Sequence, residues 1–255
     1  MVNIIIDGKK LAAAEGTTVL AAAREAGVAI PTLCSLQALR PIRACRLCIV
    51  EVQAPGLTKM VAASCDLLVA EGMEIVTNSQ EITKMRADIA ALLLAGLPDN
   101  EAIKALAASL GIFATPFTVA RPDDCALCGI CIQACQQKIG VSALSFAAKD
   151  GKSVDVVILD ADRCVGCGTC ANICPAGTIA VRDQNGKREL LLYGKLVNTL
   201  DLAFCQECAA FIATRKVINL LQNRLKEHEL TMNAAYCPVC ARENNPAPRY
   251  ERAVN

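Results

Sequence analysis

Sixteen cysteines give this 255-residue chain its clearest capacity for chemistry. One spacing occurs twice near the middle of the chain: Cys125-x2-Cys128-x2-Cys131-x3-Cys135, and then Cys164-x2-Cys167-x2-Cys170-x3-Cys174 followed by Pro175. Thiolates bind zinc, iron and iron–sulfur clusters. A zinc finger would present two cysteine pairs per ion, whereas each copy here is a triplet with a fourth cysteine. The spacing therefore predicts two [4Fe–4S] clusters.

This double run resembles that of the bacterial two-cluster ferredoxins, in which the fourth cysteine of each copy binds the other cluster. The resemblance implies one cluster on Cys125, Cys128, Cys131 and Cys174, and a second on Cys164, Cys167, Cys170 and Cys135. Such crossed ligation would hold the clusters close together, as electron transfer requires. Gly166, Gly168 and Thr169 would let backbone N–H groups approach the cluster sulfurs and raise the reduction potential.

A second set of four cysteines lies near the N-terminus: Cys34, Cys45, Cys48 and Cys65. Before it, residues 2–6 and 9–13 read as a hairpin around Asp7-Gly8, and residues 19–26 as a helix between a threonine cap and Gly27. The cap is Thr17 or Thr18, and residues 49–52 read as a further strand. Four thiolates on such a β-grasp scaffold predict a [2Fe–2S] centre, with structural zinc as the alternative.

The stretches around these cysteines, residues 30–34 and 44–52, resemble the N-terminal domain of a group of redox subunits. The group comprises the large iron–sulfur subunit of respiratory complex I, the [FeFe] hydrogenases and the diaphorase iron–sulfur subunit of NAD-linked [NiFe] hydrogenases. The resemblance covers residues 1–185. That family usually has a further [4Fe–4S] cluster, bound by one histidine and three cysteines. Residues 66–124 contain neither residue type, so we expect that cluster to be missing.

The last four cysteines, Cys205, Cys208, Cys237 and Cys240, form two Cys-x2-Cys pairs around a segment with helical periodicity. The expected apolar stripe of that helix is Phe211, Ile218, Leu221 and Leu225. Two such pairs predict a tetrahedral S4 site, for which we favour structural zinc. A third [4Fe–4S] cluster, a second [2Fe–2S] cluster and a redox dithiol remain open. His228, the only histidine, is expected to be solvated, and residues 245–250 to be extended.

The remaining segments predict an α+β fold. Residues 79–111 read as helix interrupted at residues 98–100, with a stripe of Ile82, Met85, Ile89, Leu92 and Leu93. Residues 141–147 and 153–159 read as a hairpin around residues 149–151. We expect four parts: a β-grasp [2Fe–2S] domain at 1–78, a helical spacer at 79–118, a two-[4Fe–4S] ferredoxin domain at 119–185, and a four-cysteine metal-binding helical module with a tail at 186–255.

Composition excludes several function classes. The net charge of +1 gives no electrostatic basis for binding nucleic acid, and the longest apolar stretch, residues 89–97, is too short to span a bilayer. The N-terminus lacks the basic and apolar regions of a secretion signal, which favours a cytoplasmic protein with cysteines used for metal. A Gly-x-Gly-x-x-Gly motif and a Walker loop are missing, so no catalytic site of its own is expected.

The resemblance implies an electron-transfer subunit of a soluble NAD(P)-linked complex. Its partners would be a flavin-bearing diaphorase and a catalytic subunit such as a hydrogenase, a formate dehydrogenase or an electron-bifurcating module. One alternative is a subunit of a membrane-associated, complex-I-like quinone reductase. Another, of a different class, is a zinc or iron–sulfur scaffold or assembly protein.

Overall fold

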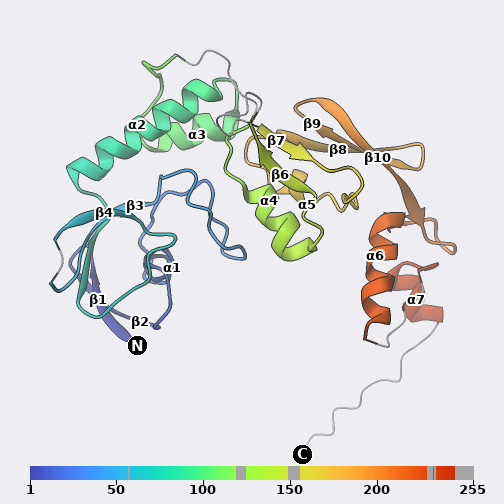
Figure 1. The fold of residues 1–255 in the computed structure, drawn as a ribbon, viewed down its shortest axis with the longest axis horizontal. Helices are drawn as coiled ribbons and strands as arrows, with labels where there is room; N and C mark the ends of the chain where they lie inside the picture. Colours follow the sequence, from blue (N-terminus) through green and yellow to red (C-terminus); the bar gives the residue numbers. More distant parts are fainter. Residues whose placement is uncertain (57, 119–124, 149–155, 229–231, 233, 245–255) are drawn as a thin grey trace, which may run out of the picture.

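A computed structural model describes the chain except for residues 57, 119–124, 149–155, 229–231, 233 and 245–255. The described parts form an arch (Figure 1). An N-terminal sheet and two helices make up one side of it, a cysteine-rich segment lies at its centre, and a second sheet leads to two short helices on the other side. The predicted turn at residues 149–151 and the tail at 245–250 lie outside the described residues.

The N-terminal domain is a five-stranded sheet with the order β2-β1-β5-β3-β4. Its elements are β1 (Val2–Ile6), β2 (Lys9–Ala13), α1 (Val19–Glu25), β3 (Ile49–Gln53), β4 (Met60–Ala63) and β5 (Met73–Val76). Asp7 and Gly8 have φ angles of 48° and 80°, the left-handed conformation of a tight hairpin turn. The Thr18 hydroxyl accepts a hydrogen bond from the Ala21 N–H and begins α1. The predicted hairpin, helix and strand are confirmed.

Two helices follow the sheet, α2 (Gln80–Gly96) and α3 (Glu101–Ser109), with side-chain caps from Ser79 and Asn100. The predicted break between them is confirmed, but the predicted stripe is partly wrong. Met85 and Leu92 are exposed, and Arg86 is buried in their place. The buried face of α2 follows residues four apart, Ile82, Arg86, Ala90 and Leu94, whereas the predicted stripe followed spacings of three and four residues. Within the described part of the chain, no helix is long and apolar enough to cross a membrane.

The central cysteine-rich domain is built from short elements. They are α4 (Ile130–Ala134), the π-helical turn η1 (Cys135–Ile139), β6 (Leu144–Ala147), β7 (Val156–Leu159) and α5 (Thr169–Asn172). Strands β6 and β7 pair antiparallel, as the predicted hairpin requires. Helices α4 and α5 each begin directly after a glycine in the left-handed conformation, Gly129 and Gly168.

A four-stranded sheet with the order β11-β10-β9-β8 follows, and it was not among the predicted elements. Its strands are β8 (Ile179–Gln184), β9 (Lys187–Leu192), β10 (Lys195–Phe204) and β11 (Phe211–Thr214). Strands β8 and β9 pair across the expected domain limit at residues 185 and 186, so the C-terminal part is not purely helical. Phe211 lies on a strand, and the expected helix is shorter, α6 (Arg215–Lys226), followed by α7 (Pro238–Asn244). Ile218 is buried on α6, whereas Leu221 and His228 are exposed.

Candidate metal centres

The N-terminal cysteine set is buried at one end of the five-stranded sheet. Cys34 and Cys45 lie on the long loop before β3, Cys48 directly precedes that strand, and Cys65 follows β4. The Cys45 N–H donates to the Cys34 sulfur at 3.4 Å, and the Leu33 N–H donates to the Cys45 sulfur at 3.4 Å. The fold therefore brings together four thiols from three separate segments.

These four thiols form two interacting pairs. The hydrogen bond from the Cys34 thiol lowers the pKa of Cys45 to about 5 and raises that of Cys34 above its usual range. The Cys65 thiol lowers the pKa of Cys48 to about 6 in the same way, and its own pKa is raised. A [2Fe–2S] core has two irons with two thiolates each, so this pairing fits that group.

The backbone around Cys48 is held by side chains that the cysteine spacing did not indicate. The Cys48 carbonyl accepts from the N–H and the hydroxyl of Ser64, at 3.0 and 2.7 Å. Arg86 on α2 binds the two neighbouring carbonyls, from Nε to Leu47 at 2.9 Å and from Nη2 to Ile49 at 2.6 Å. The spacing of Ile82, Arg86 and Ala90 at four-residue steps was the only sequence signal for this burial.

In the central domain, the eight cysteines line two cavities, four cysteines to each. The first cavity is lined by Cys125, Cys128, Cys131 and Cys174. The second is lined by Cys135, Cys164, Cys167 and Cys170. Each cavity thus combines three cysteines of one run with the fourth cysteine of the other. Four thiols around an apolar space fit a [4Fe–4S] group.

Two glycines permit this close packing. A Cβ atom at Gly129 would lie 2.1 Å from the Ile42 Cδ1 atom, and one at Gly166 would lie 2.9 Å from the Leu200 Cδ1 atom. Both glycines have positive φ angles, 68° and 67°, which other residues adopt only with strain. Backbone N–H groups also reach the sulfurs: Leu127 donates to Cys125 at 3.4 Å and Ala143 donates to Cys135 at 3.2 Å. Such bonds stabilise negative charge on sulfur.

Burial keeps several of the central thiols protonated in the absence of metal. It raises the pKa of Cys128 to about 11, and the pKa values of Cys131 and Cys170 to about 12. Neighbouring cysteines add to this effect by charge repulsion. These thiols therefore need positively charged irons to become ligands, and cluster binding would release their protons.

The N-terminal set and the first central cavity border the same buried apolar cluster. Cys34, Cys45, Leu47, Cys128 and Ile130 belong to one buried apolar cluster. The loop that carries Cys34 and Cys45 is also tied to the central domain by a hydrogen bond of 2.9 Å from the Arg40 N–H to the Gln137 side chain. The two candidate centres are thus neighbours without further cysteines or histidines between them in the described structure.

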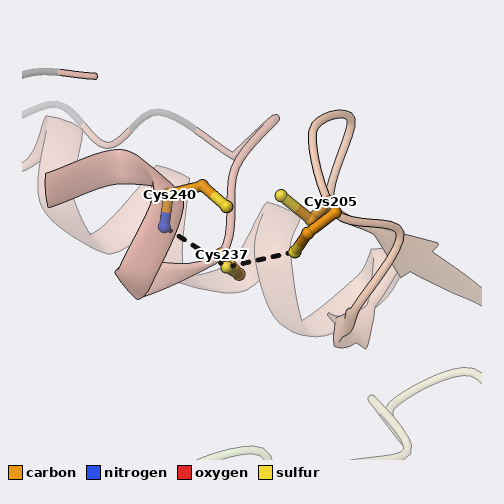
Figure 2. A group of neighbouring side chains, drawn as sticks. Cys205, Cys237 and Cys240 are labelled. Carbon is orange, nitrogen blue, oxygen red and sulfur yellow. Dashed lines mark hydrogen bonds between the residues drawn. The ribbon is translucent and has the colours of Figure 1, made fainter. Parts of the chain in front are cut away.

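The four C-terminal cysteines converge between the loop after β10 and the start of α7. Figure 2 shows the side chains of Cys205, Cys237 and Cys240 gathered there. The four sulfurs all lie within 4.8 Å of one another, and those of Cys208 and Cys237 are 3.7 Å apart. Sulfurs bound to one tetrahedral zinc at ~2.3 Å are ~3.8 Å from each other. The observed spacing fits one metal ion, because the four ligands of a [2Fe–2S] or [4Fe–4S] cluster are divided among two or four irons and do not all lie this close together.

Backbone N–H groups lower the pKa values of two of these thiols, which favours the thiolate form that binds metal. The N–H groups of Cys208 and Cys237 lower the pKa of Cys205 to about 6. The Cys240 N–H lies 3.5 Å from the Cys237 sulfur and lowers the Cys237 pKa. The Cys240 pKa is raised, chiefly by its hydrogen bond with the Cys208 thiol. The first cysteine of each pair is thereby the more readily ionised.

Comparison with protein families places two known domains in the chain. Residues 1–80 match a 2Fe-2S iron-sulfur cluster binding domain, and residues 124–178 match a 4Fe-4S dicluster domain. The chain therefore carries a [2Fe–2S] domain followed by a two-cluster [4Fe–4S] domain. The four-cysteine site at residues 205–240 lies outside both matches.

Several curated proteins are homologous to about two thirds of the chain. The NADPH-Fe(3+) oxidoreductase subunit alpha of Geobacter sulfurreducens is 29% identical over 204 residues, covering 70% of this chain and 24% of the relative. An NADH-quinone oxidoreductase subunit of Rhizobium meliloti is 29% identical over 207 residues, with the same coverage of 70% and 24%. The NADP-reducing hydrogenase subunit HndD of Solidesulfovibrio fructosivorans is 29% identical over 214 residues, covering 70% and 36%. The chain thus spans about a quarter to a third of these relatives' lengths.

Among solved structures, a crystal structure of an NAD+-reducing [NiFe]-hydrogenase in the H2-reduced state is similar in fold. Its TM-score is 0.54 at 27% sequence identity, and the match covers 62% of this chain and 74% of the other. The resemblance that the cysteine spacing indicated is thereby confirmed.

Proposed function

We propose that this chain is the electron-transfer iron–sulfur subunit of a multi-subunit, NAD(P)-linked oxidoreductase. In this proposal it relays single electrons between a flavin-bearing diaphorase partner and a catalytic partner, such as a hydrogenase, a formate dehydrogenase or an electron-bifurcating module. The observation that carries the proposal is the shared buried cluster that joins Cys34 and Cys45 of the N-terminal set to Cys128 of the first central cavity. The homology to subunits of NAD(P)-linked oxidoreductases and hydrogenases supports the choice of complex.

The ligands of the proposed clusters follow the grouping of the thiols. Cys34, Cys45, Cys48 and Cys65 would hold the [2Fe–2S] cluster. Cys125, Cys128, Cys131 and Cys174 would hold the first [4Fe–4S] cluster, and Cys135, Cys164, Cys167 and Cys170 the second. The lining of the two cavities supports this division, including the exchange of Cys135 and Cys174. When bound, the clusters supply one-electron oxidation and reduction, while the protein positions them and tunes their potentials.

The chain offers a path for electrons without a histidine-ligated cluster. Its residues 66–124 contain no cysteine or histidine, and the loop of Cys34 and Cys45 instead packs directly on Cys128 and Ile130. Transfer between the two sites would then cross a short, buried and apolar contact. A centre in a partner subunit is not needed to connect them.

For the C-terminal site we propose a single structural zinc ion held by Cys205, Cys208, Cys237 and Cys240. The close spacing of the sulfurs favours one ion over a [2Fe–2S] or [4Fe–4S] cluster. The zinc would fix α7 to the loop after β10, because each contributes one cysteine pair. A cytoplasmic location, where thiols stay reduced, fits sixteen cysteines used for metal.

Metal analysis and reduction of the purified chain test the proposal together. We expect about ten irons and one zinc per chain after anaerobic preparation. About fourteen irons without zinc would instead indicate a third [4Fe–4S] cluster, and about twelve a second [2Fe–2S] cluster. NADH or NADPH should bleach the visible absorption only after a flavin-dependent diaphorase is added. If no cluster accepts electrons from such a flavoprotein, the relay function is refuted.

A further inference from the structure

A positively charged side chain is buried beside the N-terminal cysteine set without a carboxylate partner. Arg86 on α2 is 4% exposed. In the described structure, no aspartate or glutamate oxygen lies within the 4.0 Å of an ion pair with its guanidinium. An arginine stays protonated in proteins, so this charge is permanent.

Burial of such a charge is unfavourable unless a negative group offsets it. Loss of contact with water lowers the Arg86 pKa. The attraction between the guanidinium and a Cys48 thiolate raises it again, more than any other charge does. Asp7 attracts the guanidinium more weakly, and its carboxylate is bound to the N–H and hydroxyl of Thr77 at 2.7 and 2.6 Å. The principal counter-charge for Arg86 is therefore the thiolate site itself.

We propose that Arg86 is a positioning residue that supplies the fixed positive charge for the [2Fe–2S] centre and raises its reduction potential. This inference rests on the [2Fe–2S] ligand set proposed above. The cluster with its four thiolates is anionic and gains one further negative charge on reduction. A fixed cation beside it stabilises the reduced state more than the oxidised state, because the attraction grows with the charge.

The contacts of Arg86 add a second effect in the same direction. Its two hydrogen bonds hold the carbonyls of Leu47 and Ile49, on either side of the ligand Cys48. Ser64 holds the Cys48 carbonyl itself. Three successive carbonyl dipoles are thereby engaged by donors, which reduces their repulsion of the negative cluster.

The test compares reduction potentials of full-length variants in an EPR-monitored redox titration. In Arg86→Gln, the glutamine can still donate hydrogen bonds but carries no charge. We expect its [2Fe–2S] reduction equilibrium constant to fall at least tenfold, a shift of about 59 mV to more negative potential for a one-electron couple. Arg86→Lys keeps the charge, and its constant should stay within about threefold of wild type.

Two controls separate the local charge from other causes. Lys84→Gln removes a positive charge from the exposed side of the same helix, so the [2Fe–2S] potential should not change. The potentials of the two [4Fe–4S] clusters serve as internal references in every variant. An unchanged potential in Arg86→Gln, or an equal fall in Arg86→Gln and Arg86→Lys, would overturn the proposal.

If Arg86→Gln does not assemble the cluster, the pH dependence of the [2Fe–2S] potential in Arg86→Lys tests the proposal instead. A buried lysine loses its proton more readily than arginine, so the [2Fe–2S] potential should fall more steeply with pH than in wild type between about pH 7 and about pH 10. Parallel pH profiles would overturn the role of the charge. Absence of any [2Fe–2S] EPR signal in the wild-type chain would instead refute the proposed function, whereas a normal signal with an unshifted potential refutes only the role of Arg86.

Discussion

Ile42 of the N-terminal loop lies against Gly129 of the first central site, and a single added methyl group tests this contact. In Gly129→Ala, the added Cβ atom would lie 2.1 Å from the Ile42 Cδ1 atom and 3.1 Å from the Phe146 Cζ atom. The Ile42 Cδ1 atom ends a flexible, half-buried side chain that can move, so the steric cost is about 1 kcal/mol, at the low end for overpacking. The left-handed φ of 68° costs alanine about 1–2 kcal/mol more.

The sum, about 2–3 kcal/mol, should lower the midpoint of thermal cluster loss by roughly 7 °C, at ~2–4 °C per kcal/mol for a chain of this size. The assay is the loss of visible cluster absorption on anaerobic heating. All variants are compared at one heating rate, because unfolding of such a protein is not reversible.

A matched glycine isolates the contact from the backbone strain. Gly177, in the same domain, has a φ of 66°, and a Cβ atom added there would meet no atom within 4 Å, so Gly177→Ala should show only the smaller, strain-related fall. Adding Ile42→Ala to Gly129→Ala should recover the steric part, judged against Ile42→Ala alone. Equal falls for Gly129→Ala and Gly177→Ala, without recovery by Ile42→Ala, would refute the packing of the loop on the central domain.

Four further predictions concern the metal sites and the link between domains. Cys174→Ser should alter the EPR signal of the first [4Fe–4S] cluster and leave the second unchanged; the opposite result would contradict crossed ligation. Cys208→Ser should lose the zinc while iron content stays constant. Zinc affinity should fall as pH decreases, since Cys240, with its raised pKa, must release a proton on binding; a pH-independent affinity in a competition titration would contradict this. Asn100→Ala should lower the thermal midpoint through the loss of about 0.5–2 kcal/mol from the α3 cap and of the 2.8 Å bond to the Ala176 carbonyl, whereas Asn100→Asp should keep the cap and lose only that bond.

The sequence alone was sufficient where a local pattern leaves few alternatives. Cysteine spacing identified the iron–sulfur domains, because only certain arrangements of thiolates suit a cluster. The Asp7-Gly8 turn was equally predictable, and so was a threonine cap for α1, although the sequence left open whether Thr17 or Thr18 forms it. A tight hairpin requires positive φ angles and a helix start requires a side-chain acceptor, and both are properties of a few adjacent residues.

The sequence was insufficient where burial depends on distant segments. Met85 fits an apolar stripe, yet it is exposed, while Arg86 is buried because α2 lies on the carbonyls of Leu47 and Ile49. The sheet of β8 to β11 was not predicted, although Asn185-Gly186 between β8 and β9 has the residue types and the positive φ angles, 52° and 72°, of a tight hairpin turn.

The sequence by itself thus determined which residues can bind metal and which kinds of cluster their spacing suits. Only the tertiary structure decided which thiols meet. It placed Cys135 and Cys174 in exchanged cavities, Cys45 in the same buried cluster as Cys128, and the C-terminal sulfurs close enough for one ion. The physical reason is that spacing along the chain constrains neighbours, whereas the distance between separate segments is set by the packing of the whole fold.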